Sequence, residues 1–221
     1  FPLGETIVTW TATDSSGNSS SQSYTISFID TVIPEILISD QTFEATIFSG
    51  TNMPLEFPEI IDIQNTELTN DAPEVFPLGE TIVTWTATDR FGNSSFSLQT
   101  ISVQTCGNDP LSYNLIVGSE EDDILIGTTL SDLIFGNGGD DIISGDKGND
   151  CIIAGDGNDI IFGNEGDDNI SGQDGNDIIK GQSGEDFIFG GFGLDVIDGG
   201  EDIDTCKIID EQNYDIVIKC E

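Results

Sequence analysis

Aspartate recurs every nine residues through the second half of this sequence, and this spacing is the strongest sign of chemistry in the chain. Each nine-residue unit opens with glycine, except one that opens with Ala154, and carries aspartate at its sixth position. The ten sixth-position residues are Asp123, Asp132, Asp141, Asp150, Asp159, Asp168, Asp177, Asp186, Asp195 and Asp204. Hard cations such as Ca²⁺ prefer carboxylate and carbonyl oxygens, about six to eight of them in tolerant geometry. The pattern therefore predicts a row of calcium sites.

Other positions of the unit are equally regular. The eighth position is Leu or Ile in nine of the ten units, and the fourth is glycine except at Glu121, Leu130 and Asp202. We expect glycines at the first and fourth positions to adopt backbone dihedrals closed to other residues, so that six residues turn and aim their carbonyls inward. The other three residues then form a short strand. A solvated acidic loop is the alternative, and ten units in one register weigh against it.

The units resemble the RTX (hemolysin-type) nonapeptide GGxGxDxUx. The resemblance implies a parallel β-roll in which two units form one coil of 18 residues, aspartates stack along each edge, and eighth-position side chains form an inner aliphatic ladder. It also implies that folding depends on calcium, with about five to eight Ca²⁺ ions bound. Besides the aspartates, the expected metal ligands are turn residues at the fourth and second positions: Gly139, Gly148, Gly157, Gly166, Gly175, Gly184, Asn137, Asp146, Gly155, Asn164, Gln173 and Gln182.

The seventh and ninth positions of the units should face outward in such a roll. Many of them are apolar, including Ile124, Ile142, Ile160, Phe162, Phe187 and Phe189. These residues could form a contact surface for a neighbouring module or another chain, or they could simply favour β structure. The sequence leaves both interpretations open.

The first half of the chain contains a different repeat, because the string FPLGETIVTWTATD stands at residues 1–14 and again at residues 76–89. Its alternation of bulky and small polar residues predicts a half-buried strand, with Trp10 and Trp85 as core anchors. Turns at residues 14–18 and 89–93 should lead to returning strands at 23–29 and 98–103. Shorter strands are expected near 35–38, 41–45 and 55–61.

This string, with the following DxxGN, resembles the hyalin repeat (HYR), which implies an immunoglobulin-like β-sandwich of extracellular adhesion proteins. The sequence thus predicts an all-β chain of sandwich modules followed by a parallel β-roll. The expected parts are the C-terminal portion of one HYR-like module (1–30), a second module (31–105), a linker (106–117), the roll (118–207) and a capping strand (208–221). Because residue 1 lies inside a repeat, we expect the protein to continue upstream.

Four cysteines without a CxxC pair or any histidine favour disulfides over a zinc or redox site. Cys206 and Cys220 flank a short strand-like segment, and a bridge between them would clamp the last coil, with free buried thiols as the alternative. Cys106 and Cys151 remain as a second pair if residues 106–117 fold back over the third and fourth coils. Both bridges would imply an oxidising compartment outside the cytoplasm.

Composition narrows the function further. Asp and Glu number 42 against 5 Lys and Arg, a formal net charge of -37, which excludes nucleic acid as a partner and calls for cations or salt to offset self-repulsion. Adaptation of the surface to a saline environment is the alternative cause. No apolar run could span a bilayer. The chain has no histidine, no GxSxG elbow and no phosphate-binding loop, so we expect no enzyme activity in it.

The hypothesis is therefore a calcium-binding segment of a secreted or cell-surface adhesive or structural protein, whose sandwich modules could bind a cell-surface or matrix protein or a glycan. The alternative is the C-terminal secretion or folding segment of an extracellular enzyme or toxin whose catalytic domain lies upstream. A longer sequence would distinguish the two.

Overall fold

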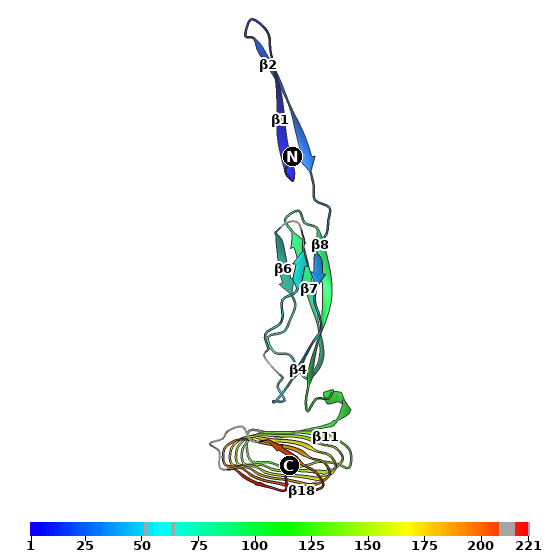
Figure 1. Cartoon of the computed structure of the whole chain (residues 1–221), viewed down its shortest axis with the longest axis vertical. Helices are drawn as coiled ribbons and strands as arrows, with labels where there is room; N and C mark the ends of the chain where they lie inside the picture. The colour runs from blue at the N-terminus through cyan, green and yellow to red at the C-terminus, as the bar shows by residue number, and fades with distance from the viewer. Residues whose placement is uncertain (51–52, 63–64, 208–214, 221) are drawn as a thin grey trace. The chain divides into compact units, whose positions relative to one another are not determined.

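The computed structural model describes residues 1–50, 53–62, 65–207 and 215–220. The protein is all-β, and the described part contains one short 3-10 helix, η1 (Pro110–Ser112) (Figure 1). The chain forms two compact units, of which the first comprises residues 1–39, 55–72 and 82–99 and the second comprises residues 40–54, 73–81 and 100–221. No helix in the described ranges is long and apolar enough to cross a membrane.

The first copy of the repeated string forms a long antiparallel hairpin, as expected. Strands β1 (Gly4–Thr13) and β2 (Ser19–Phe28) pair from Gly4↔Phe28 to Thr13↔Ser19. The connecting turn is held by Asp14, whose Oδ1 accepts from the backbone N–H groups of Ser16 and Asn18, both at 2.9 Å. Asp is favoured here because its short side chain can bond the backbone of its own turn.

The prediction that Trp10 is a core anchor is wrong. Trp10 is 69% exposed, whereas Trp85, at the same place in the identical string, is 1% exposed. In the described chain β1 and β2 form a two-stranded sheet, so neither face of the hairpin is covered by a second layer. Trp85 lies in a four-stranded sheet, and its Nε1 donates to Gln99 Oε1 at 2.9 Å. Burial here depends on the surrounding strands and not on the local sequence.

The second copy of the string lies in a sheet with the strand order β4-β8-β7-β6, accompanied by a two-stranded sheet β3-β5. Strand β6 lies where the sequence analysis expected no strand. It pairs antiparallel with β7, and β4 pairs parallel with β8. The strands are β3 (Glu35–Leu37), β4 (Gln41–Glu44), β5 (Glu59–Ile61), β6 (Thr66–Asn70), β7 (Gly79–Asp89) and β8 (Ser94–Gln104).

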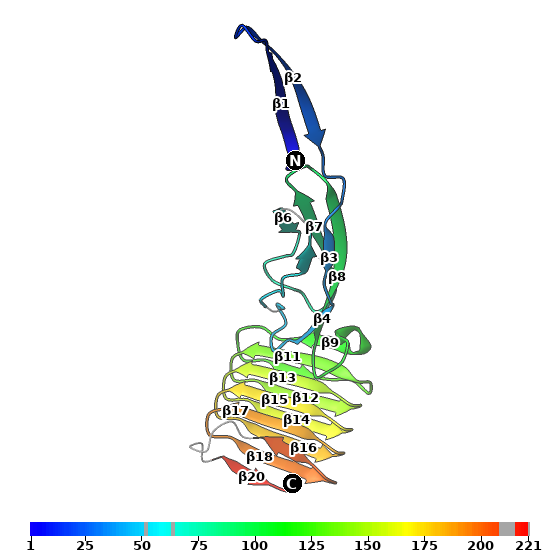
Figure 2. The same ribbon diagram turned by 45° about the horizontal axis from the view of Figure 1, so that its top comes forward.

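The C-terminal part is a parallel β-solenoid of about five turns at residues 114–218, which confirms the predicted β-roll (Figure 2). Strands alternate between two six-stranded parallel sheets, so each strand pairs with the strand two further along the chain. One sheet contains β10 (Ile124–Ile126), β12 (Ile142–Lys147), β14 (Ile160–Glu165), β16 (Ile178–Ser183), β18 (Val196–Glu201) and β20 (Ile216–Ile218). The other contains β9 (Asn114–Val117), β11 (Asp132–Gly138), β13 (Cys151–Asp156), β15 (Asn169–Asp174), β17 (Phe187–Phe192) and β19 (Thr205–Lys207).

The interior of the roll is the predicted aliphatic ladder. Equivalent residues of neighbouring coils lie 18 apart, as in Ile143↔Ile161 and Ile134↔Ile152. The inward residues are Leu125, Ile134, Ile143, Ile152, Ile161, Ile170, Ile179, Ile188 and Ile197, and all but Leu125 are fully buried. A single unit could not shield such a side chain from water, so only stacking makes the coil stable.

The outward apolar positions behave differently on the two sheets. On the sheet with β11 and β13, Leu133, Phe135, Cys151 and Ile153 form a second buried cluster against Leu78, Cys106 and Tyr113 of the same unit. On this sheet, part of the outward apolar surface is thus covered by residues of the same unit. On the opposite sheet Ile124 and Ile142 stay exposed.

Both predicted disulfides are present. Cys106 is bonded to Cys151 on β13, and Cys206 on β19 is bonded to Cys220, just beyond β20. The first bond attaches the start of the segment 106–117, which includes η1 and β9, to the outer face of the roll. The second bond lies at the last rung of the ladder, where Cys206 and Cys220 pack against the aliphatic cluster.

Candidate metal centre

The turns of the roll require a left-handed backbone at two positions. Second-position residues Asn137 and Gln173 both have φ of 76°, and fourth-position Gly139 and Gly157 have φ of 102° and 140°. The other expected turn ligands share this conformation: Asp146, Gly148, Gly155, Asn164, Gly166, Gly175, Gln182 and Gly184. Asparagine tolerates the left-handed region better than most side chains, and glycine adopts it without steric cost.

The expected reason for the first-position glycine is wrong, because its φ is not in the left-handed region. This glycine is needed for close approach instead. A Cβ added to Gly136 would collide with Oδ2 of Asp141 in its own turn and with the carbonyl of Ala154 in the next coil. Most first-position glycines meet the same two obstacles. The fifth unit accommodates a methyl at this place, since it opens with Ala154, so the constraint is strong but local.

The carbonyl oxygens of the second and fourth positions point along the stack toward the next turn. A Cβ on Gly155 would collide with the carbonyl of Asn137, and one on Gly157 would collide with the carbonyl of Gly139. The carbonyl oxygens of one turn thus face the next turn 18 residues later. This is the arrangement in which two turns could share an ion.

The sixth-position aspartates form one continuous column along each edge of the roll. From Asp141 to Asp204, Oδ1 of each accepts the backbone N–H of the aspartate one coil earlier, at 2.8–3.0 Å, as between Asp150 N and Asp168 Oδ1. The other oxygen, Oδ2, is buried and has no hydrogen-bond partner among the described residues. This holds for Asp141, Asp150, Asp159, Asp168, Asp177, Asp186, Asp195 and Asp204. Burying an unpaired carboxylate oxygen is costly, so each column presents a row of unsatisfied oxygens that a cation could bind.

Electrostatics of the column agree with this geometry. Burial, with a smaller contribution from the charge of the neighbouring aspartate in the column, raises the pKa of Asp168 to about 8 and that of Asp150 to about 7. Burial also raises the pKa of Asp177 to about 7 and of Asp159 and Asp186 to about 6. The ordinary value is 3.8. Without a cation, desolvation shifts each of these carboxyl groups toward its neutral form, because burial penalises the charged form.

Two of the predicted aspartates differ from the rest. Oδ2 of Asp123 accepts from the backbone N–H and hydroxyl of Ser119, and these bonds lower the pKa of Asp123. Oδ2 of Asp132 accepts from the N–H and hydroxyl of Thr128. Both carboxylates are therefore satisfied by protein donors. Their units are the first two, which lack the fourth-position glycine.

The sequence analysis missed Asp215. Its Oδ1 accepts the backbone N–H of Asp195 at 3.0 Å, and its Oδ2 is buried without a partner in the part of the chain that the structure describes. The signal was the string Asp-Ile-Val-Ile at residues 215–218, which has the aspartate and aliphatic residue of the unit but lies two residues out of register.

The chemistry of the donor set fits Ca²⁺. It consists of carboxylate and carbonyl oxygens, which suit a hard cation, and the chain has no histidine. Within the described residues no three acidic or cysteine side chains converge on a single point, so a site also needs backbone carbonyls. The turn stack supplies them.

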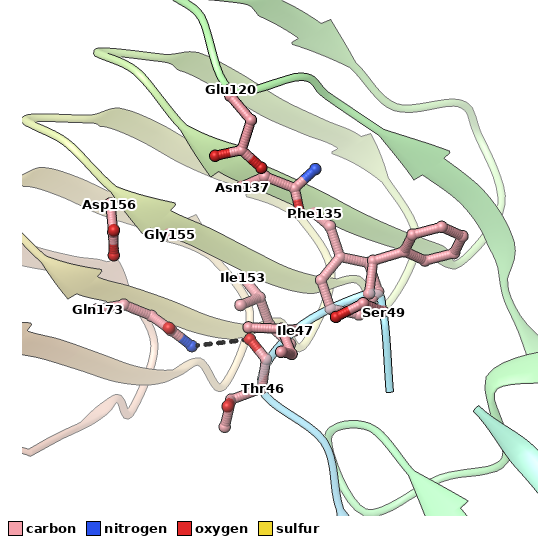
Figure 3. Close-up of a pocket in the computed structure, with 11 residues that line it drawn as sticks. Thr46, Ile47, Ser49, Glu120, Phe135, Asn137, Ile153, Gly155, Asp156 and Gln173 are labelled. Atoms are coloured by element: carbon pink, nitrogen blue, oxygen red, sulfur yellow. Dashed lines mark hydrogen bonds between the residues drawn. The ribbon is translucent and has the colours of Figure 1, made fainter. Parts of the chain in front are cut away.

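The turns on one edge also contact the segment 46–49. Gln173 Nε2 donates to the carbonyl of Thr46 at 3.2 Å, and the rings of Phe48 and Phe135 lie 5.8 Å apart. The turns and this segment line a pocket, and Figure 3 shows Asn137 and Gln173 among its side chains together with Ile47 and Ile153. Gln173 thus has two roles, because its carbonyl is directed along the stack and its side chain bonds the neighbouring segment.

Comparison with known proteins gives two results. The model of the RTX calcium-binding nonapeptide repeat matches residues 117–151, 151–179 and 171–206. The chain is also similar to hyalin of Lytechinus variegatus, with 33% identity over 125 residues that cover 52% of this chain and 24% of that protein. Hyalin of Strongylocentrotus purpuratus is 36% identical over 112 residues, 47% of this chain and 9% of that protein.

A third relative is the rat (Rattus norvegicus) sushi, von Willebrand factor type A, EGF and pentraxin domain-containing protein 1. It is 36% identical over 100 residues, 42% of this chain and 3% of that protein. The chain thus spans less than a quarter of the length of each of these relatives.

Proposed function

We propose that this chain, which carries RTX calcium-binding nonapeptide repeats and hyalin-repeat modules, binds several Ca²⁺ ions in the stacked turns of its β-roll and needs them to fold that region. The observation that carries the proposal is the column of eight aspartates with a buried and unpartnered Oδ2. A divalent cation between neighbouring turns replaces repulsion within the column by attraction to a shared charge.

The ligands follow from the geometry of the turns. Carboxylates of the eight aspartates would bind together with the carbonyls of second- and fourth-position residues, such as Asn137 and Gly139. Asp123 and Asp132 are left out of this proposal because Ser119 and Thr128 already satisfy them. The eight remaining turns stand four along each edge, so turns that face each other give about six ions, within the five to eight expected from the sequence. Mg²⁺ fits less well, since it demands near-ideal octahedral geometry and keeps its waters.

The setting proposed is extracellular. Two disulfides persist only in an oxidising compartment, and free calcium is plentiful outside cells. Similarity to hyalin supports an adhesive or structural protein, with a cell-surface or matrix protein or a glycan as partner of the sandwich modules. We assign no catalytic role to the carboxylates, because they recur at every turn and do not face each other across one cleft.

Calcium titration of the whole chain, followed by far-UV circular dichroism, tests the proposal. We expect a cooperative gain of β structure with Ca²⁺ and little change with Mg²⁺. Asp177→Asn should weaken the response, because Asp177 belongs to the column. The matched control is Asp174→Asn, which removes the same charge from an exposed third-position residue of the same turn. A roll that is fully formed in excess chelator at neutral pH would refute calcium-dependent folding, and an absence of bound calcium would refute the function.

A further inference from the structure

Residues 215–220 add the last strand, β20, to the roll, although the C-terminal sequence lacks the glycine-rich turn pattern. Strand β20 pairs parallel with β18 through Val196↔Ile216 and Ile197↔Val217, which is an offset of 20 residues. The other described strand pairs of the roll all have an offset of 18. The carbonyl of Lys219 lies where a Cβ on Gly199 would collide with it. In the preceding coil the carbonyl of Gly199 holds the same place against Gly181. The backbone of Lys219 therefore occupies the position of an opening glycine.

Asp215, directly before β20, holds the place of a sixth-position aspartate. Its Oδ1 accepts from Asp195 N at 3.0 Å, which continues the bond that every earlier aspartate of the column makes. Its Oδ2 is buried and unpartnered, and so is Oδ2 of Asp195, whose side chain is almost completely buried. Two carboxylates thus follow one another at the end of the column with no protein donor for either free oxygen in the described residues.

The N-terminal and C-terminal ends of the roll have different residues at the end of an aspartate column. At the N-terminal end, in the column on the other edge of the roll, the residue one coil before the first aspartate is Asn114, and its Nδ2 donates to Asp132 Oδ1 at 2.6 Å. An amide closes that end without any cation. At the C-terminal end the residue is Asp215, which has no hydrogen to donate in its charged form. A cap that served only to end the roll would be better made with asparagine.

The tail is held in this position by a covalent bond. Cys206, the last rung of the ladder, is bonded to Cys220, five residues after Asp215. Cys220 also packs against the ladder. A disulfide near a ligand reduces the conformational entropy that binding would otherwise have to overcome.

We propose that Asp215 and Asp195 together hold a Ca²⁺ ion at the C-terminal end of the roll, at a site that lies outside the nonapeptide pattern. This inference rests on the calcium binding proposed above. The turn at residues 190–195 supplies the remaining protein ligands, the carbonyls of its second- and fourth-position glycines Gly191 and Gly193, both of which have the left-handed backbone of the other turns. The ion ties the tail to the last complete turn.

The test is the number of calcium ions bound by the full chain, measured by equilibrium dialysis with metal analysis and by isothermal titration calorimetry. Asp215→Asn should bind one ion fewer than the unmodified chain and retain the other sites. Asp174→Asn, which removes an exposed carboxylate, should bind the full number. The double variant Cys206→Ser/Cys220→Ser should lower the affinity of one site by about tenfold or more, because the tail is no longer tethered.

Three outcomes would overturn the inference. An unchanged number of ions in Asp215→Asn would show that Asp215 binds none. A loss of every ion in that variant would show that Asp215 supports the fold of the whole roll and not one site. An affinity loss in the double cysteine variant that adds fully to that of Asp215→Asn would place the disulfide's effect elsewhere. If the unmodified chain binds no calcium, the proposed function itself fails.

Discussion

Truncating one rung of the aliphatic ladder should raise the calcium concentration at which the roll folds. Ile178 and Ile179 are neighbours in strand β16, and they differ only in the side of the sheet they face. Ile179 points inward, is 0% exposed and pairs with Ile161 and Ile197 on the adjacent coils. Ile178 points outward and is 41% exposed. Changing each to alanine separates core packing from strand preference within one unit.

The expected loss in the free energy of unfolding follows from the burial of each side chain. Truncating a buried isoleucine to alanine leaves a cavity and costs about 2–5 kcal/mol, and we expect about 3 kcal/mol at Ile179, which is enclosed by ladder side chains on both sides. The stacked coils cannot collapse around the cavity without breaking strand pairing, so relaxation should be limited. Ile178→Ala should cost less than about 1 kcal/mol, since it removes exposed surface and some β-propensity.

Linkage converts this energy into a calcium midpoint. If about five ions are released together on unfolding, about 3 kcal/mol divided over five binding events raises the midpoint about threefold, because about 1.4 kcal/mol corresponds to a factor of ten. If only one ion were linked to folding, the same loss would raise the midpoint roughly 150-fold. The size of the shift therefore also reports the number of coupled ions.

The assay is a calcium titration of the full chain followed by circular dichroism, with both variants in the same buffer and the disulfides intact. We expect the order unmodified chain, Ile178→Ala, Ile179→Ala in rising midpoint, with a clear gap before the last. Equal midpoints for the two variants would refute the inward ladder as the source of stability. A cost for Ile179→Ala in chemical denaturation, but no change in calcium midpoint, would refute the coupling between packing and metal.

Three further predictions concern pH, the sandwich and the turns. Burial raises the pKa of Asp168 to about 8, above its ordinary value of 3.8. Protonation therefore stabilises the metal-free roll at low pH, and that stability is lost as the pH rises toward 8. In chelator, circular dichroism should show more β structure at pH 5 than at pH 8, and the reverse order would contradict the assignment. Trp85→Ala should cost about 3–5 kcal/mol in chemical denaturation and Trp10→Ala less than about 1 kcal/mol, because only Trp85 is buried; similar costs would show that context does not decide burial. Gly175→Ala should raise the calcium midpoint, since φ is 144° and the new Cβ would collide with the carbonyl of Gly157, whereas Gly17→Ala, in the hairpin turn, should leave it unchanged.

Much of the roll could be predicted from the sequence because its repeat makes every coil equivalent. Once one unit is assigned, the ladder, the aspartate column and the 18-residue offset follow for all of them, and the structure contains each. The two disulfides also follow, since four cysteines allow few pairings and Cys206 lies close to Cys220 in sequence.

The features that escaped prediction depend on contacts between segments. Exposure of Trp10 is set by which strands lie beside the hairpin, and an identical string gives the opposite result at Trp85. The need for glycine at the first position arises from the next coil, so φ-based reasoning about Gly136 alone gave the wrong cause. Asp215 was missed because two extra residues shift it out of the nine-residue register.

Departures from the repeat pattern are as informative as the pattern itself. The first two units have Ser119 and Thr128 at the second position, and these residues donate to the carboxylate oxygen that stays free in the eight later units. The same two units lack the fourth-position glycine, which is needed only where a carbonyl of one turn must approach the next closely. Because both changes occur together, the roll begins with turns closed by hydrogen bonds, and the unpartnered carboxylate oxygens start where the hydroxyl donors end. The third unit, with Asn137 and Gly139, is therefore the first whose aspartate keeps an unpartnered Oδ2, and under the proposed function it is the first that needs calcium.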